Sequence, residues 1–205
     1  KNVIREAKQY IQDNFQDPDL SVEKICRHLH LPLQAGADAV LKAMNRHYTV
    51  AEYEALIARL RSRIDGLTVS TDLILGFPGE TEALFKETME TLKRLNFSHI
   101  HAFPYSPRKG TPAATMSGQI DTAEKKRRVE LVNELSARQK AALLESLVGT
   151  KASVLIETQE GTEGEGFTGN YERVAVKGLS EGAQRTVVSV ALVGTDGKKL
   201  LAEAL

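Results

Sequence analysis

The sequence predicts an α/β protein in which parallel βα units, forming a partial (βα) barrel or a small open sheet, are followed by a small all-β barrel and preceded by a helical hairpin. Apolar residues recur at helical spacing in the first 30 residues. Strand-like and helix-like segments then alternate over residues 31–149, which is typical of parallel βα units. Residues 150–205 read as short β-type segments between Gly-rich turns. These changes predict three domains, 1–30, 31–149 and 150–205.

Composition excludes several classes of protein. The 205 residues are 41% hydrophobic and 26% charged, with a formal net charge of zero, so no overall field attracts nucleic acid or an acidic membrane. No apolar run approaches the roughly 20 residues of a spanning helix, so we expect no membrane segment. The single cysteine, Cys26, excludes an internal disulfide framework and fits a cytoplasmic protein.

The first 30 residues have the pattern of two helices. Apolar residues at helical spacing predict the first over residues 4–15, and the Asp-Pro-Asp cluster at residues 17–19 ends it. Ser21 is placed to cap a second helix that we expect to run to His30.

The middle domain is expected to alternate strands and helices. Thr49 and Glu52 form a capping box before the stripe Tyr53, Leu56, Ile57, Leu60 and Ile64. Asp38 is expected to cap the helix before it. In chain order the predicted elements are a strand at 31–34, helices at 38–46 and 49–65, a strand at 67–75, a helix at 81–95, a strand at 96–103 and a long helix at 121–147.

The last 55 or so residues predict three to five short strands. The β-type segments are 152–157, 166–176 and 186–193, and Thr195-Asp196-Gly197-Lys198 has the composition of a hairpin turn.

The segment L-I-L-G-F-P-G-E-T, residues 73–81, is the most specific single feature. An apolar strand ends in a Gly-Phe-Pro-Gly loop, at the sheet edge where α/β proteins bind ligands. Gly76 and Gly79 would let the backbone approach a ligand, and Pro78 stiffens the turn. The alternative is an ordinary β-to-α turn.

Three motifs occur in order: L-H-L-P-L-Q-A-G-A-D-A-V-L-K-A-M-N-R-H-Y-T from Leu29, S-T-D-L-I-L-G-F-P-G-E-T from Ser70, and H-A-F-P-Y-S-P-R-K-G-T-P-A-A from His101. Together they resemble the radical S-adenosylmethionine tRNA methylthiotransferases, in particular the branch that acts on N6-threonylcarbamoyladenosine beside the anticodon. G-F-T-G-N-Y-E-R-V-A-V from Gly166 is similar to the RNA-binding TRAM β-domain of that family. The resemblance covers about residues 29–205.

The resemblance implies that the partial barrel is of the radical SAM type and holds S-adenosylmethionine across its strand ends. Gln34 and Asp72 would face the cofactor from the ends of two strands, and Arg46 would pair with the methionine carboxylate. The loop against the adenine and ribose would consist of Gly76, Phe77, Pro78, Gly79 and Glu80. The alternatives are that Gln34 ties down a loop, Arg46 is a helix C-terminal charge, and Asp72 caps a turn.

The same resemblance implies that the partner is a tRNA anticodon stem-loop. The predicted RNA contacts are Tyr105, Ser106, Arg108 and Lys109 at the substrate mouth, and Asn170, Tyr171 and Arg173 on the β-domain. For the β-domain group the alternative is a plain strand. The basic run at residues 125–128 suits RNA phosphates or a solvated helix face.

The cysteine content of the chain departs from that of the family it resembles. Its chemistry requires a 4Fe-4S cluster held by a C-x-x-x-C-x-x-C triplet, and a second cluster held by three more cysteines. Cys26 stands alone, so we expect this chain by itself to bind no cluster and to have no methylthiotransferase activity, and we assign it no catalytic residue. Ala35 and Ala37 also replace the two serines of the family's Gln-Ser-Gly-Ser. His99 and His101 share a strand face, but without a carboxylate nearby they predict no metal site.

Residues 4–31 resemble a different family, the DNA-binding domain of AraC-type regulators. The recognition helix that should follow is absent, so DNA binding is not expected. The two resemblances overlap at residues 28–31, which fits a recombined reading frame; a divergent N-terminus is the alternative. Two further functions stay open: an RNA-binding module that acts through the β-domain, and a regulator fragment.

Half a barrel leaves a strand unpaired. We expect the strand at 31–34 to be an exposed edge, and the first 120 residues to be marginally stable and prone to self-association.

Overall fold

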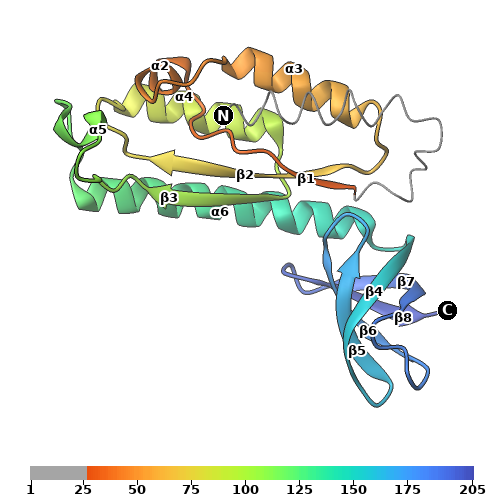
Figure 1. Ribbon diagram of the computed structural model, residues 1–205. Coiled ribbons are helices and arrows are strands. Elements are labelled where there is room, and N and C mark those ends of the chain that lie inside the picture. Colours follow the sequence, from red (N-terminus) through yellow and green to blue (C-terminus); the bar gives the residue numbers. More distant parts are fainter. Residues whose placement is uncertain (1–26) are drawn as a thin grey trace. The chain divides into compact units, whose positions relative to one another are not determined.

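The computed structural model describes residues 27–205 (Figure 1). The helical hairpin expected over residues 1–30 therefore falls outside the described residues, except for its last four. The chain forms two compact units. The sheet unit contains His30–Asp65 and Val69–Ser136, and the barrel unit contains Gly66–Thr68 and Ala137–Leu205, together with residues 27–29 of the described chain.

A three-stranded sheet in the order β1-β2-β3 organises the first part (Figure 1). Its strands are β1 (His28–His30), β2 (Thr68–Leu75) and β3 (His99–Pro104). β2 and β3 are parallel, with register from Ser70 opposite His99 to Leu75 opposite Pro104. The parallel arrangement expected from the βα pattern is thus present, and β1 and β3 are the outer strands of the described sheet.

The first strand lies three residues earlier than predicted. Residues 28–30 are extended, not the end of a helix. Within the predicted strand at 31–34, the Leu31 N–H donates to the Ser70 carbonyl at 2.9 Å, and Gln34 forms an isolated bridge to Leu73. Pro32 has no N–H to donate, and the Leu33 N–H turns to the Thr71 hydroxyl at 2.8 Å. The ladder is interrupted there and resumes at Gln34.

Threonine side chains cap two of the helices. α3 (Val50–Arg61) starts at the predicted capping box, with Thr49 and Glu52 bonded reciprocally. α4 (Glu82–Leu95) is capped by the Thr81 hydroxyl. The remaining helices are α2 (Asp38–Ala43), α5 (Pro112–Thr115), which was not predicted, and α6 (Thr122–Leu147).

α2 differs from the prediction at both ends. Asp38 does not cap it, since the N-cap is Ala37; the Asp38 carboxylate accepts instead from the Val50 N–H at 2.7 Å, at the start of α3. The helix ends at Ala43 because Asn45 adopts a left-handed φ of 57°.

The two faces of β2 are unequal. Thr71, Leu73 and Leu75 are fully buried, whereas Asp72 and Ile74, which alternate with them, are half-buried. The predicted α3 stripe is buried too, and the Tyr53 hydroxyl donates to the Leu31 carbonyl at 2.6 Å. The face that carries Asp72 and Ile74 is called the open face below.

The barrel unit is a closed five-stranded barrel in the order β4-β5-β6-β8-β7. The strands are β4 (Lys151–Glu160), β5 (Glu163–Thr168), β6 (Arg173–Lys177), β7 (Val187–Thr195) and β8 (Leu200–Ala204). The segment 166–176, predicted as one strand, is two, because Tyr171 takes a left-handed φ of 63° between them. The predicted hairpin is present: the Asp196 carboxylate accepts from the N–H groups of Lys198 and Lys199. β8 was not predicted.

None of the helices in the described part of the chain is both long and apolar enough to cross a membrane.

Candidate functional site

Gln34 and Arg46 meet beside β2. The Gln34 N–H donates to the Asp72 carbonyl and its own carbonyl accepts from the Ile74 N–H, both at 2.9 Å, with Gln34 at a left-handed φ of 70°. The Arg46 guanidinium donates to the Gln34 side-chain oxygen at 3.3 Å. Gln34 therefore ties its segment to β2 through the backbone and orients Arg46 through its amide. A guanidinium has five N–H donors, so Arg46 retains capacity for a carboxylate.

Asp72 does not lie at a strand end as predicted. It occupies the middle of β2, opposite His101 of β3, because β2 continues to Leu75. Its carboxylate faces the His30 ring, with 3.3 Å between Oδ2 and Nε2. The Asp72 backbone, not its side chain, contacts Gln34.

The loop after β2 is held together from within. The Gly76 N–H donates to the Glu80 carboxylate at 2.6 Å, and the Glu80 N–H to the Phe77 carbonyl at 3.0 Å. Phe77, Pro78 and Glu80 are buried, and among the five loop residues only Gly79 is exposed. The side chains predicted to face a cofactor therefore point mainly into the protein.

The two loop glycines are required for different reasons. Both have left-handed φ, 73° at Gly76 and 85° at Gly79. A Cβ at Gly76 would lie 2.4 Å from Cγ of Lys125, so this glycine also makes room for α6. A Cβ at Gly79 would have nothing within 4 Å. Only Gly79 offers backbone for the close approach of a ligand.

A buried ion pair fastens this loop to α6. Arg128 Nη1 lies 2.7 Å from Glu80 Oε2 and 2.8 Å from the Glu80 carbonyl, and both side chains are at most 5% exposed. Burial raises the pKa of Glu80, and the hydrogen bond from Arg128 opposes that rise. Glu80 is thus a structural residue of the loop.

The basic run at residues 125–128 is divided between exposed side chains, Lys126 and Arg127, and buried ones. Lys125 and Arg128 are buried, and Arg127 pairs with Glu82 and Glu124 at 2.7 Å. Hydrogen bonds from Arg127 and then Arg128 lower the pKa of Glu124 to about 2. The i,i+4 spacing of Glu124 and Arg128 was a signal that could have predicted part of this network.

An open pocket of about 630 Å³ lies beyond the end of β3. Its lining residues are Ile74, Phe103, Pro104, Tyr105, Ser106, Arg108, Thr111 and Ala113. Three of the four predicted substrate-mouth residues are in this lining, and Lys109 is not. The apolar lining residues Ile74 and Phe103 were not predicted, although the two-residue period of each strand places them on the same open face as Asp72 and His101.

Tyr105 gives the pocket a polar group. Its ring packs edge-on against Phe77 at 5.2 Å, with Nζ of Lys125 5.2 Å from the ring centre. The buried Tyr105 hydroxyl has no hydrogen-bond partner among the described residues. An unpaired buried hydroxyl is costly, so a ligand group that reached it would satisfy it.

The three predicted RNA contacts of the barrel differ in their exposure and in the partners that their side chains already have. Tyr171 is 58% exposed and stacks on Phe167 with 5.0 Å between ring centres. The Asn170 side-chain oxygen accepts from the Thr168 hydroxyl, and Arg173 pairs with Glu165, both at 2.5 Å. Tyr171 is therefore largely exposed, whereas the side chains of Asn170 and Arg173 already have partners within the barrel.

The residues of this chain do not suit an iron–sulfur cluster. Such clusters are held mainly by several thiolates, and the chain has one cysteine.

Comparison with known proteins supports part of the resemblance. Residues 18–92 match the model of the radical SAM superfamily. The chain is 45% identical over 148 residues to the tRNA-2-methylthio-N(6)-dimethylallyladenosine synthase of Moorella thermoacetica, covering 72% of this chain and 33% of that protein. It is 42% identical over 165 residues to the probable threonylcarbamoyladenosine tRNA methylthiotransferase of Methanocaldococcus jannaschii, covering 80% and 38%.

A solved structure, coproporphyrinogen III oxidase from Escherichia coli, described as a radical SAM enzyme, has a TM-score of 0.48 at 12% identity, covering 92% of this chain and 49% of that chain.

The chain therefore contains radical SAM sequence and is homologous over part of its length to tRNA methylthiotransferases, but spans only about a third of the relatives it matches. The radical SAM match begins inside the segment assigned to the AraC-like hairpin, so the boundary at residue 30 stays a prediction.

Proposed function

We propose that this chain is the carboxyl-terminal portion of a radical SAM tRNA methylthiotransferase. Its substrate would be N6-threonylcarbamoyladenosine beside the anticodon, as in the name of the Methanocaldococcus relative. The observation that supports this most directly is the pocket beyond β3, whose lining includes three residues of the family motif, Tyr105, Ser106 and Arg108. A tRNA substrate would also place the protein in the cytoplasm.

Arg46 and Gly79 are the proposed contacts for S-adenosylmethionine. Arg46 would bind the methionine carboxylate, with Gln34 holding the guanidinium in place. The open space at Gly79 would admit the adenine or ribose against the backbone. Phe77, Pro78 and Glu80 would act from inside the loop, by fixing its shape. The bound cofactor supplies radical chemistry in this family, and that chemistry needs thiolates that the chain does not provide.

The cluster can be tested directly. Anaerobic reconstitution of the chain with iron and sulfide should give no 4Fe-4S absorption or electron paramagnetic resonance signal, because one thiolate cannot hold a cluster. Formation of a stable cluster would contradict the proposal that the chain is inactive alone.

RNA binding tests the substrate. We expect the chain to bind an anticodon stem-loop, with Tyr105, Ser106, Arg108 and Lys109 at the sheet unit and Asn170, Tyr171 and Arg173 on the TRAM-like barrel as contacts. Anisotropy titrations should compare stem-loops that carry threonylcarbamoyl, dimethylallyl or unmodified adenosine. Tightest binding of the threonylcarbamoyl form supports the proposed branch, whereas preference for dimethylallyl would assign the chain to the other.

A second function, an RNA-binding module that acts through the barrel alone, is favoured by the exposure of Tyr171. Y171A should weaken binding by roughly 5- to 100-fold if a base stacks there. R108E separates the two functions: it should weaken binding only if the sheet unit also contacts RNA. H47A, an exposed site outside both groups, is the control. Binding that is unchanged in Y171A and R108E would contradict both functions.

A further inference from the structure

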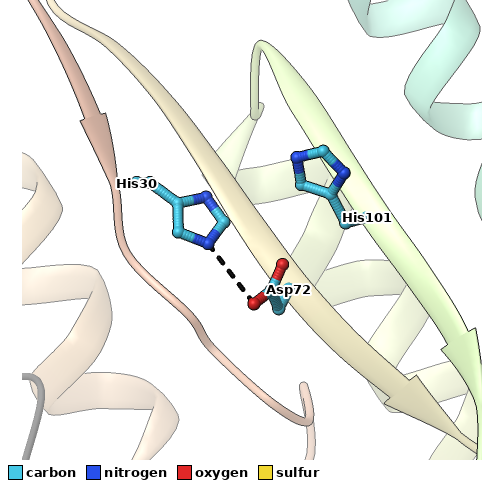
Figure 2. A group of neighbouring side chains, drawn as sticks. All are labelled: His30, Asp72 and His101. Atoms are coloured by element: carbon cyan, nitrogen blue, oxygen red, sulfur yellow. Dashed lines mark ion pairs between the residues drawn. The ribbon is translucent and has the colours of Figure 1, made fainter.

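The open face of the sheet brings together one polar side chain from each strand. His30 comes from β1, Asp72 from β2 and His101 from β3 (Figure 2). One potential ligand atom from each residue lies within 4.8 Å of the other two. Asp72 and His101 are direct partners in the parallel register, so their side chains share a face by construction.

We propose that His30, Asp72 and His101 bind a divalent transition-metal ion such as zinc. Two imidazoles and a carboxylate are a common ligand set for such ions. Ligand atoms of a tetrahedral site with bonds of about 2.0–2.1 Å lie roughly 3.3 Å apart. The distance between His30 Nε2 and Asp72 Oδ2 is already 3.3 Å. The ligand atom of His101 lies within 4.8 Å of the other two and would have to move closer to them to complete the triangle.

His30 has the outer hydrogen bond that histidine ligands typically have. Its Nδ1 lies 3.0 Å from the Ser70 hydroxyl, on the far side of the ring from Asp72. When Nδ1–H donates to this hydroxyl, Nε2 presents its lone pair to the site, as a ligand must. The rival arrangement has Ser70 donating to Nδ1 and Nε2–H donating to Asp72, which would be a hydrogen-bonded pair without a metal.

The site would leave coordination positions open. The side chains of His30 and Asp72 are 43% and 33% exposed, and His101 is exposed, so water or a ligand could reach the ion. Three protein ligands with an open position are typical of reactive rather than structural zinc sites. Ile74 and Phe103, two residues further along the same face, line the pocket described above, so an ion would lie on the face on which that pocket opens.

His99 and His101 predicted no metal site because the sequence places no carboxylate near them. The structure supplies it from β2, and replaces His99 by His30 in the group whose atoms are close enough. The inference does not depend on the proposed function, since it uses no cysteine, no S-adenosylmethionine and no RNA.

The test is a cobalt titration of the whole chain after treatment with a chelator. One equivalent of Co²⁺ should produce d–d absorption bands, which Zn²⁺ should abolish by competition. H30A, D72N and H101A should each weaken binding by about tenfold or more, and S70A, which removes the outer hydrogen bond, by roughly tenfold. H47A and C26S are the controls and should bind as the original chain does.

The proposal would be overturned if the original chain showed no d–d bands, which is the result expected if His30 and Asp72 form a hydrogen-bonded pair without a metal. Metal binding that survives in D72N would overturn it as well. Equal loss in H99A or C26S would show that other ligands hold the ion.

A measurement without substitutions guards against variants that fail to fold. Bound Co²⁺ should shift or broaden nuclear magnetic resonance signals around Asp72 and His101. Effects confined to the barrel strands would contradict the assignment.

Discussion

The sheet unit and the barrel unit solve the same problem, the pairing of β-strands, in opposite ways. The barrel closes on itself around an apolar core, with Val154, Ile156, Val174, Val176, Val190 and Leu192 among its buried residues. One buried carboxylate of this unit, Glu172, pairs with Lys140. The described sheet has two outer strands, an open face with polar side chains, and a buried ion pair. Closure makes the barrel self-sufficient, whereas the open sheet keeps polar groups where a ligand can reach them.

The largest expected effect is loss of the buried ion pair in the sheet unit. R128M would leave the Glu80 carboxylate buried without its cation, and should lower the free energy of unfolding of the sheet unit by about 3–5 kcal/mol. Urea denaturation with hydrogen exchange of β2 amides measures this. The double variant E80Q/R128M should be less destabilised than R128M, because no charge is stranded. Equal exchange rates in β2 of R128M and the original chain would show that the pair is not structural.

The matching change in the barrel removes apolar contacts instead of charge. I156A deletes most of a fully buried side chain and should cost about 2–5 kcal/mol, with faster exchange in the strands of the barrel. V187A, at a side chain that is 68% exposed, should stay within about 0.5 kcal/mol of the original chain. If I156A and V187A lowered the free energy of unfolding by equally small amounts, the stability of the barrel would not depend on its apolar interior.

A smaller effect is expected at the hydrogen bond between α3 and the segment after β1. Y53F removes the hydroxyl that donates to the Leu31 carbonyl, which still accepts from the Thr71 hydroxyl at 2.8 Å. We therefore expect a loss of only about 0.5–1.5 kcal/mol by thermal denaturation. Y171F, on the exposed barrel tyrosine, is the matched control and should change little. A loss in Y53F above that range would mean that Thr71 does not compensate.

The smallest effect concerns pH. The arginines beside Glu124 hold its pKa at about 2 in the folded protein, below the ordinary value of 4.5. A lowered pKa stabilises the fold above about pH 4.5, and this stabilisation disappears as the pH falls towards 2. Melting temperatures measured between these pH values should therefore fall less steeply in E124Q than in the original chain. E130Q, at an exposed glutamate of the same helix, should keep the original slope.

Predictability from the sequence depended on the distance between interacting residues. The capping box at Thr49 and Glu52 and the hairpin around Gly197 involve residues within four positions, and both were predicted correctly. The sheet starts at His28, three residues before the predicted start. The break in the strand near Pro32 was not predicted either, because it depends on where the Leu33 N–H finds an acceptor on β2. The single strand predicted over 166–176 was wrong although Gly169-Asn170 is a local turn signal; the left-handed residue of that turn is the next one, Tyr171.

By itself the sequence determined the succession of helix, strand, helix and strand over residues 49–104 and the shared strand face of His99 and His101, since each depends on neighbouring residues and the two-residue period of a strand. That Gly79 is open whereas Gly76 is blocked by Lys125 was decided by the packing of α6. Only the tertiary structure decided which charges are consumed inside the protein and which converge on its surface. Glu80 meets Arg128 across 48 positions, and His30, Asp72 and His101 meet because parallel register aligns three strands. Such contacts are set by packing between elements, which no local pattern of residues encodes.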